Sequence, residues 1–238
     1  MLLELAGISR RFGAVVAADG IALSVAPGEA LGIIGANGAG KSSLFNLVTG
    51  VLKPDAGTVT FDGHDITRLP ARARSRLGIG RSFQIPRPFE SLTVFENLLV
   101  AAEFGGAGGG GAQHCGEVLE RTGLITKANI VSGKLTLLDR KRLELARALA
   151  TRPKLILLDE IAGGLTEGEV HELVALIRAL HAEGMTIVWI EHIVHALLSV
   201  VSRLVVLEFG RKIAEGEPRA VMADPAVRRS YLGIDEAA

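Results

Sequence analysis

Eight residues at positions 35–42, Gly-Ala-Asn-Gly-Ala-Gly-Lys-Ser, restrict the possible folds of this 238-residue chain more than any other feature. They fit the pattern G-x-x-x-x-G-K-[ST] at every fixed position, and they lie between an apolar run and a predicted helix. Glycines allow successive backbone N–H groups to wrap a phosphate, and the following helix directs its positive end at the same anion. With glycine at about 7% of average composition, a chance match has odds on the order of one in a hundred. The segment therefore predicts a phosphate-binding loop.

Apolar strands alternate with helical segments over much of the chain, which predicts a parallel sheet covered by helices. The expected strands are residues 2–8, 20–25, 30–34, 58–61, 155–158, 186–190 and 204–207. The expected helices include residues 42–49, which Gly50 ends, and residues 169–183. From about Pro86 to Arg152 the pattern is helical and lacks strands, so we expect a helical lobe inserted into an α/β core. Six glycines at positions 105–111 interrupt that lobe and predict a flexible loop tip without chemistry.

Composition excludes several classes of protein. Basic and acidic residues balance at 26 each, so no overall field holds a polyanion, and we expect no non-specific nucleic-acid binding. The single Cys115 excludes an intrachain disulfide framework and fits a reducing cytosol. The first residues lack the basic region and cleavage site of a signal peptide, and polar residues interrupt the most apolar stretch, at 193–207. We therefore expect a chain that is soluble by itself.

Two acidic residues, Asp159 and Glu160, follow the apolar run at 155–158. A buried strand delivers its last side chains to the edge of a parallel sheet where a phosphate loop also lies. Asp159 is suited to hold Mg²⁺, directly or through water, and Glu160 is suited to activate the attacking water as general base. The alternative is a pair of solvated acids that begin a helix, where the dipole favours them. The intact phosphate loop upstream favours the catalytic interpretation.

The next predicted strand, at 186–190, also ends in a polar pair, Glu191 and His192. His192 is expected to donate to the γ-phosphate and to sense its loss, although a lone histidine is more often structural. In loops of this type the lysine reaches the β- and γ-phosphates and the hydroxyl ligates Mg²⁺, so Lys41 and Ser42 take these roles. A GTPase would need Asn-Lys-x-Asp and D-x-x-G motifs, and the sequence contains neither. A small-molecule kinase would lack the paired acids followed by His192.

The order of these segments resembles the nucleotide-binding subunit of ABC transporters over nearly the whole chain. It comprises the loop at 35–42, Gln84 after Arg-Ser-Phe, residues 142–149, Asp159 with Glu160, and His192. The resemblance implies an α/β fold: a P-loop NTPase (RecA-like) core, an N-terminal antiparallel β subdomain and an inserted helical (signature) subdomain. It assigns residues 1–85 and 154–238 to the ATP-binding core and C-terminal tail, and residues 86–153 to the helical subdomain.

The resemblance also implies an ATP and Mg²⁺ site. The residues expected to contact the nucleotide in the loop are Gly35, Asn37, Gly38, Ala39, Gly40, Lys41, Ser42 and Ser43. Phe12 matches the position whose ring stacks on adenine, with a core residue as the alternative. Gln84 would contact both Mg²⁺ and the attacking water and lie near a transmembrane partner, so the implied metal ligands are Ser42, Gln84 and Asp159. Two such subunits would form a head-to-tail dimer around two ATP molecules.

The segment aligned with the family signature departs from it. The family usually has Leu-Ser-Gly-Gly-Gln, whereas residues 135–139 read Leu-Thr-Leu-Leu-Asp. Thr136 keeps the hydroxyl that would touch the partner's ATP, and Thr136-x-x-Asp139 predicts a capping box for a helix at 140–150. Asp139 adds an anion, which residues 140–142 (Arg-Lys-Arg) are expected to offset, and Thr166 stands where the dimer-contacting loop often has Asp. We hypothesise that the site using this signature is weak and that the site using Lys41 and Glu160 is productive. Such asymmetry fits a heterodimer with a second ATPase subunit, with a homodimer as the alternative.

Flanking segments resemble the ATPases of branched-chain amino-acid importers. These are Lys134-Leu-Thr, the helix at 142–149, Ile190-Glu-His and the ending at 220–233. The resemblance implies two transmembrane permease subunits, a periplasmic solute-binding protein, and a peripheral location on the cytoplasmic face of the inner (cell) membrane. Importers of urea or short-chain amides remain alternatives. A soluble ABC-type ATPase acting on DNA or ribosomes would usually carry a coiled-coil insert or a second cassette, and this chain has neither.

Overall fold

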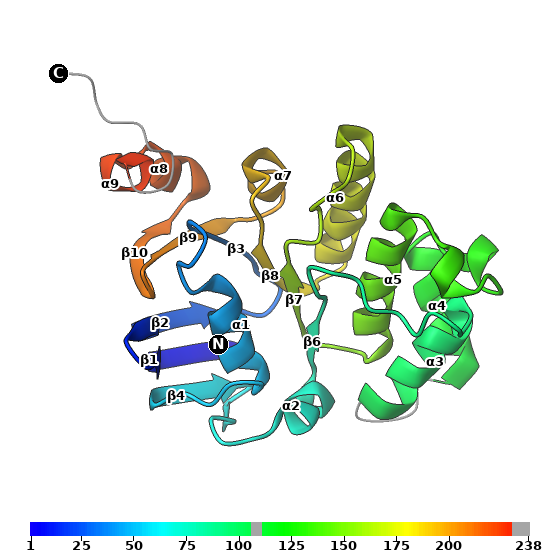
Figure 1. Ribbon diagram of the computed structural model, residues 1–238, viewed down its shortest axis with the longest axis horizontal. Helices are drawn as coiled ribbons and strands as arrows, with labels where there is room; N and C mark the ends of the chain where they lie inside the picture. Colours follow the sequence, from blue (N-terminus) through cyan, green and yellow to red (C-terminus); the bar gives the residue numbers. More distant parts are fainter. Residues whose placement is uncertain (106–110, 230–238) are drawn as a thin grey trace. The chain divides into compact units, whose positions relative to one another are not determined.

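The computed structural model describes residues 1–105 and 111–229, and the chain divides into two compact units. The first unit contains residues 1–70 and the segment from 188 onward, and the second contains residues 71–187 (Figure 1). The domain limits implied by the resemblance remain a prediction. The glycine-rich loop tip falls mainly on residues 106–110, outside the described residues; Gly105 ends one helix and Gly111 begins the next.

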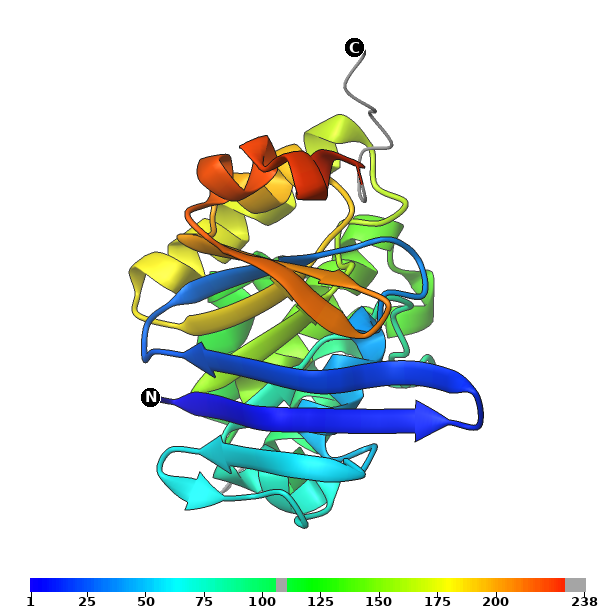
Figure 2. The ribbon, with the colours of Figure 1, turned by 90° about the vertical axis from the view of Figure 1, so that its left-hand side faces the viewer.

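An antiparallel sheet forms the N-terminal part of the first unit, with the strand order β2-β1-β4-β5. Its strands are β1 (Leu3–Phe12), β2 (Val15–Val25), β4 (Ala56–Phe61) and β5 (His64–Asp65). Figure 2 shows β1 and β2 side by side, with β4 along the other edge of β1. Alternate residues of β1, such as Leu3 and Leu5, are buried, which fixes the register because a one-residue slip would expose them. The antiparallel subdomain implied by the resemblance is thus present.

The rest of the first unit contains parallel pairing. β3 (Ala30–Ile34) is buried at every position and pairs in parallel with β9 (Arg203–Glu208), which pairs antiparallel with β10 (Arg211–Gly216). A continuously apolar strand is the pattern of a parallel sheet covered on both faces. The helices of this unit are α1 (Lys41–Thr49), α7 (Val194–Leu198), α8 (Pro218–Ala223) and α9 (Pro225–Val227). Gly50 ends α1 in the left-handed conformation, as predicted.

The second unit combines a parallel strand pair with a helical lobe. β6 (Ile79–Arg81) pairs in parallel with β7 (Leu155–Asp159), and β8 (Thr186–Ile190) carries the chain back to the first unit. The helices are α2 (Ala71–Leu77), α3 (Val94–Gly105), α4 (Gly111–Arg121), α5 (Leu137–Ala150) and α6 (Glu167–Ala182), with short 3₁₀ turns η1 (Ile125–Lys127) and η2 (Ser132–Lys134). Helices α3, α4 and α5 pack side by side (Figure 1). In residues 1–105 and 111–229, no helix has the length and apolar character needed to cross a membrane.

Candidate functional site

The loop between β3 and α1 has a shape that requires glycine at both of its ends. Gly40 has a φ of 100°, and a Cβ there would lie 2.3 Å from the carbonyl oxygen of Ala17. A Cβ on Gly35 would lie 2.3 Å from the carbonyl oxygen of Leu207. Real Cβ atoms do not approach backbone oxygens so closely, so the glycines let the loop turn tightly against its own unit. This is the backbone geometry that a phosphate-binding loop needs.

Lys41 begins α1 and folds back over the loop. Its side chain is buried, and Nζ donates to the carbonyl oxygens of Gly35 at 2.7 Å and Ala36 at 3.0 Å. The helix has no acidic residue in its first turn and no side-chain cap, which suits an anionic ligand rather than internal capping. Of the other predicted contact residues, Asn37, Gly38 and Ser42 are exposed, Gly40 and Ser43 are half-buried, and Gly35 and Ala39 are buried.

Phe12 lies at the end of β1 with 44% of its surface exposed, so the alternative of a core residue is wrong. The guanidinium of Arg10 stands over its ring at 4.8 Å from the centroid. A separate pocket of about 640 Å³ adjoins Gly38 and is lined by residues of β1, β2 and the β9–β10 hairpin. Phe209, at the tip of that hairpin, has a φ of 45° and is 79% exposed. The ring of Phe12 is therefore accessible for stacking. Phe209 is a second exposed ring in the same unit, and the sequence analysis does not single it out.

The end of β7 in the second unit brings Asp159 against a cation. Asp159 is 5% exposed, and its Oδ2 accepts a hydrogen bond from Nη2 of Arg81 at 2.8 Å. Arg81 comes from β6, which is the parallel neighbour of β7, and it also stands over the ring of Phe83 at 5.1 Å. The buried carboxylate thus has a compensating charge, as buried ions require. Arg81 was not predicted as a site residue.

Gln84 and Glu160 meet beside this pair. Nε2 of Gln84 donates to Oε2 of Glu160 at 2.7 Å. Glu160 has a φ of 47°, in the left-handed region that residues with a Cβ rarely adopt. Three predicted site residues of the second unit, Gln84, Asp159 and Glu160, therefore lie together at the ends of β6 and β7.

The signature segment builds a capped helix start, as predicted, but α5 begins at Leu137 rather than at residue 140. The hydroxyl of Thr136 accepts from the N–H of Asp139 at 3.3 Å and donates to its Oδ2 at 2.9 Å. The return bond of a capping box is replaced by this contact. Asp139 is 3% exposed and forms an ion pair with Lys127.

The expectation that residues 140–142 offset Asp139 is wrong. Arg140 donates to the carbonyl oxygens of Gly133 and Leu135, Lys141 donates to that of Gln84, and Arg142 pairs with Glu172. These side chains leave α5 on other faces, because consecutive helical residues point about 100° apart. The compensating cation comes instead from η1, ten residues before α5 begins.

His192 belongs to the first unit and follows β8. His192 is exposed, and its backbone N–H donates to Oε1 of the buried Glu191 at 2.9 Å. Glu191 therefore stabilises the turn after β8 in which His192 lies exposed. The predicted site residues thus fall into a group in each unit, and the roles assigned to them remain predictions.

Two protein families match the chain. The family described as ABC transporter matches residues 18–163, and the family described as branched-chain amino acid ATP-binding cassette transporter matches residues 211–237. The chain belongs to the ABC transporter family. As a cassette of this family, it has the mixed α/β fold that the sequence predicted, and the predicted resemblance to ATP-binding subunits of the branched-chain type is confirmed.

Relatives match this ABC cassette over nearly its full length. The high-affinity branched-chain amino acid transport ATP-binding protein BraF of Pseudomonas aeruginosa is 35% identical over 98% of both chains. LivG of Escherichia coli, which has the same description, is 36% identical over 98% of both chains. A crystal structure of a nucleotide-free cassette from an ABC transporter superposes with a TM-score of 0.88 at 33% identity, covering 99% of each chain. An ADP-bound cassette gives 0.89 at 34% identity, covering 98% of this chain and 99% of that one.

Proposed function

We propose that this ABC cassette binds and hydrolyses ATP to energise an importer of branched-chain or related hydrophobic amino acids. The names of BraF and LivG and the ADP-bound relative support the proposal. The observation that carries the catalytic part is the hydrogen bond between Gln84 and Glu160 beside the buried Asp159. Import of another solute, such as urea or an amide, is the second candidate, because the solute does not touch an ATPase subunit.

The roles of the residues in the proposed reaction follow from the resemblance to ABC cassettes. The loop amides and Lys41 of the first unit hold the phosphates, Phe12 stacks on adenine, and His192 donates to the γ-phosphate. Stacking on one aromatic ring contributes about 1–3 kcal/mol in nucleobase complexes. Glu160 accepts the proton of the attacking water, and Gln84 fixes the orientation of its carboxylate. The limits proposed for the core, 1–85 and 154–238, and for the helical subdomain, 86–153, follow from the same resemblance.

The donor set also fits magnesium. The Ser42 hydroxyl, the Gln84 amide oxygen and the Asp159 carboxylate are oxygen ligands, and Mg²⁺ is bound in proteins by oxygen and completed by substrate phosphates. The ion, when bound, neutralises charge on the phosphates of the nucleotide. Asp159 is held at the end of β7 by its ion pair with Arg81, which fixes the direction of the carboxylate.

We further propose that this subunit works beside a second, unlike ATPase subunit. The start of α5 is occupied by its own anion, Asp139, which Thr136 and Lys127 hold in place. The side chain of Leu137, which is 41% exposed, would stand in the way of a phosphate of the partner's ATP, and the helix start already holds an anion of its own. The site completed by this signature is therefore weak, and a heterodimer is favoured over a homodimer. Transmembrane permease subunits, a periplasmic solute-binding protein, and the cytoplasmic face of the inner membrane complete the proposal, without nucleic acid.

The decisive experiment measures ATP binding and turnover of the chain in a purified complex with its second ATPase subunit. Glu160→Gln keeps a side chain of the same size but removes the base, so we expect ATP binding to persist while turnover falls at least about 100-fold. Lys41→Ala should lose nucleotide binding. Glu167→Gln, an exposed glutamate seven residues further on, is the matched control and should turn over like the wild type. Wild-type turnover in the Glu160→Gln variant contradicts its assignment as base, and ATP left intact by the wild-type complex contradicts the function.

A further inference from the structure

Helix α5 presents a row of charged side chains to the backbone of residues 84–87. Lys141 donates to the carbonyl oxygen of Gln84 at 2.6 Å. Glu144 accepts from the N–H of Arg87 at 2.8 Å, and Arg147 donates to the carbonyl oxygen of Arg87 at 2.8 Å. Residues three apart on a helix share a face, so the three side chains form one continuous row, with Arg147 also bonded to Glu144 at 2.8 Å.

The three side chains bond to backbone groups of residues 84 and 87. Lys141 is 2% and Glu144 is 3% exposed, so two charges have been taken from water to reach backbone groups. Burying a charge costs free energy unless it is compensated by pairing and hydrogen bonds. A simple surface contact would not need buried ions, and the fixed position of the segment is what they provide.

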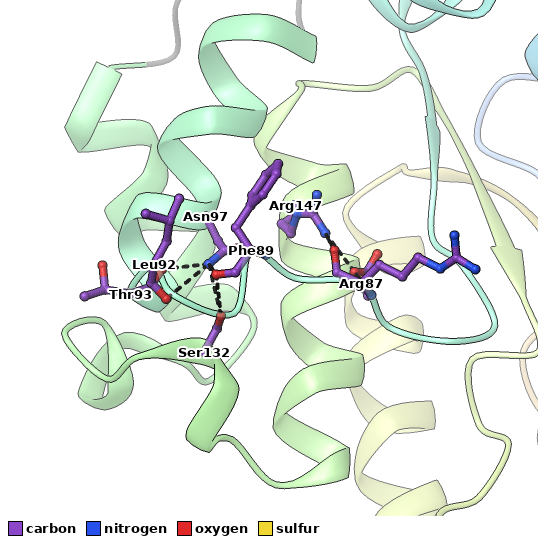
Figure 3. Close-up of polar contacts among 8 residues, drawn as sticks. Arg87, Phe89, Leu92, Thr93, Asn97, Ser132 and Arg147 are labelled. Atoms are coloured by element: carbon purple, nitrogen blue, oxygen red, sulfur yellow. Dashed lines mark hydrogen bonds and ion pairs between the residues drawn. The ribbon is translucent and has the colours of Figure 1, made fainter.

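The other end of the same segment is fixed independently. The carbonyl oxygen of Phe89 accepts from the hydroxyl of Ser132 at 2.9 Å and from Nδ2 of Asn97 at 3.2 Å. The backbone N–H of Phe89 donates to Oδ1 of Asn97 (Figure 3). Arg147 reaches both parts, because its guanidinium also stands over the ring of Phe89 at 5.2 Å. The backbone from 84 to 89 is therefore anchored at both ends, and the position of Gln84 within the second unit depends on α5.

Lys141 lies where this row approaches the catalytic pair. Its ammonium is 2.6 Å from the carbonyl oxygen of Gln84 and 3.5 Å from that of Glu160. The side chains of these two residues are joined by the 2.7 Å bond described above. One buried cation thus faces the main chain of both partners, and a displacement of the ammonium changes how Gln84 meets Glu160.

We propose that Lys141 is a positioning residue for hydrolysis, which with Glu144 and Arg147 sets Gln84 against Glu160. This inference rests on the proposed function. Helix α5 carries the signature segment in its first turn, and it also carries Lys141, which positions Gln84 beside the proposed base. In this role Lys141 does not react itself, and it acts chiefly through the main chain of Gln84.

The test is a kinetic cycle on the same two-subunit complex, with Lys141→Met, Gln84→Ala and the double variant of this chain. Lys141→Met should lower kcat roughly 10- to 100-fold, because small displacements of catalytic groups have effects of this size. The KM for ATP should stay within about twofold, since the phosphate loop is in the other unit. If Lys141 acts through Gln84, the double variant is no slower than Gln84→Ala. Arg121→Met, which removes an exposed cation paired with Glu183 in the same unit, should change neither constant.

Hydrogen exchange of a peptide covering residues 84–89 gives a second readout that needs no turnover. Loss of the Lys141 anchor should speed exchange of this peptide about tenfold and leave α6 unchanged. Equal protection in the variant and the wild type, or additive losses of kcat in the double variant, overturns the inference. A wild-type complex that leaves ATP intact overturns the proposed function instead, and hydrogen exchange still decides whether the row holds the segment.

Discussion

Asn97 illustrates how much of this structure depends on single buried amides. Its side chain lies on α3 and is fully buried, and both of its ends are used (Figure 3). Oδ1 accepts from the N–H of Phe89 at 2.8 Å, and Nδ2 donates to the carbonyl oxygen of Thr93 at 2.9 Å and to the hydroxyl of Ser132 at 3.3 Å. A buried polar group that is fully bonded fixes its neighbours, whereas a partly bonded one is costly.

We expect Asn97→Asp to lower the free energy of unfolding by about 3 kcal/mol at neutral pH. The change keeps the size of the side chain but replaces the donor with an acceptor that faces the carbonyl oxygens of Phe89 and Thr93. Asn129→Asp, an exposed position in the same unit, is the control and should cost less than about 0.5 kcal/mol. Urea unfolding measures both, and similar losses in the two variants would disprove the role given to Asn97.

Residues with chemistry fixed by local pattern could be predicted from the sequence, and residues that act through distant partners could not. The loop at 35–42 and the pair Asp159–Glu160 can be recognised from the sequence because their neighbours along the chain define the strand ends and turns. Arg81 meets Asp159 across 78 positions, and Lys141 meets Gln84 across 57. Their only local signal is a charge beside a motif, which is ordinarily a solvated side chain.

At the scale of elements, the start of α6 has a signal in the sequence. Thr166 and Glu169 form a complete capping box, in which the carboxylate of Glu169 accepts from the N–H and the hydroxyl of Thr166, each at 2.8 Å. The pattern Thr-x-x-Glu predicts this start, whereas the family resemblance concerns Thr166 only as a replacement in a dimer-contacting loop. The helix consequently begins at Glu167, before the predicted residue 169, while the strands β3 and β8 have the predicted bounds because their apolar runs are uninterrupted.

The capping box should give α6 a measurable dependence on pH. The bonds from the backbone N–H and then the hydroxyl of Thr166 lower the pKa of Glu169 below its ordinary value of 4.5. A group whose pKa is lower in the folded state contributes stability above its unfolded pKa and loses it as the pH falls through the folded value. Glu169→Gln should therefore flatten the acid side of the stability curve, measured by urea unfolding from about pH 3 to pH 7. An unchanged slope relative to wild type, or the same flattening in Glu167→Gln, would contradict this assignment.

At the scale of the whole molecule, the cassette carries its candidate chemistry in two units that differ in how they are recognised. The first unit is defined by a loop motif, and the second by contacts among β6, β7 and α5 that only the fold reveals. Relatives that cover 98% or more of this chain support the treatment of both units as one cassette. Assembly with other subunits depends on surfaces, and the start of α5 is one surface where the sequence differs from the usual family signature given by the resemblance.

In a purified complex with its second ATPase subunit, Lys41→Ala and Thr136→Val should have unequal effects. Lys41 belongs to the site proposed as productive, so its loss should remove most of the turnover, by at least about tenfold. Thr136 belongs to the start of α5, which is already neutralised from within, so its loss should change turnover less than about twofold. The ATPase rate of the complex is the measurement. Equal losses, or a fully active homodimer with two equivalent sites, would refute the asymmetry.

The left-handed backbone at Glu160 places selection for stability in conflict with selection for ATP turnover. Glycine or asparagine would occupy this φ of 47° with less strain, so pressure for thermal robustness alone pulls the position away from glutamate. Pressure for turnover pulls it back, because the turn aims the carboxylate at the amide of Gln84. The chain therefore keeps a locally unfavourable conformation at the residue proposed as the catalytic base, and a descendant that no longer hydrolyses ATP is expected to relax there first.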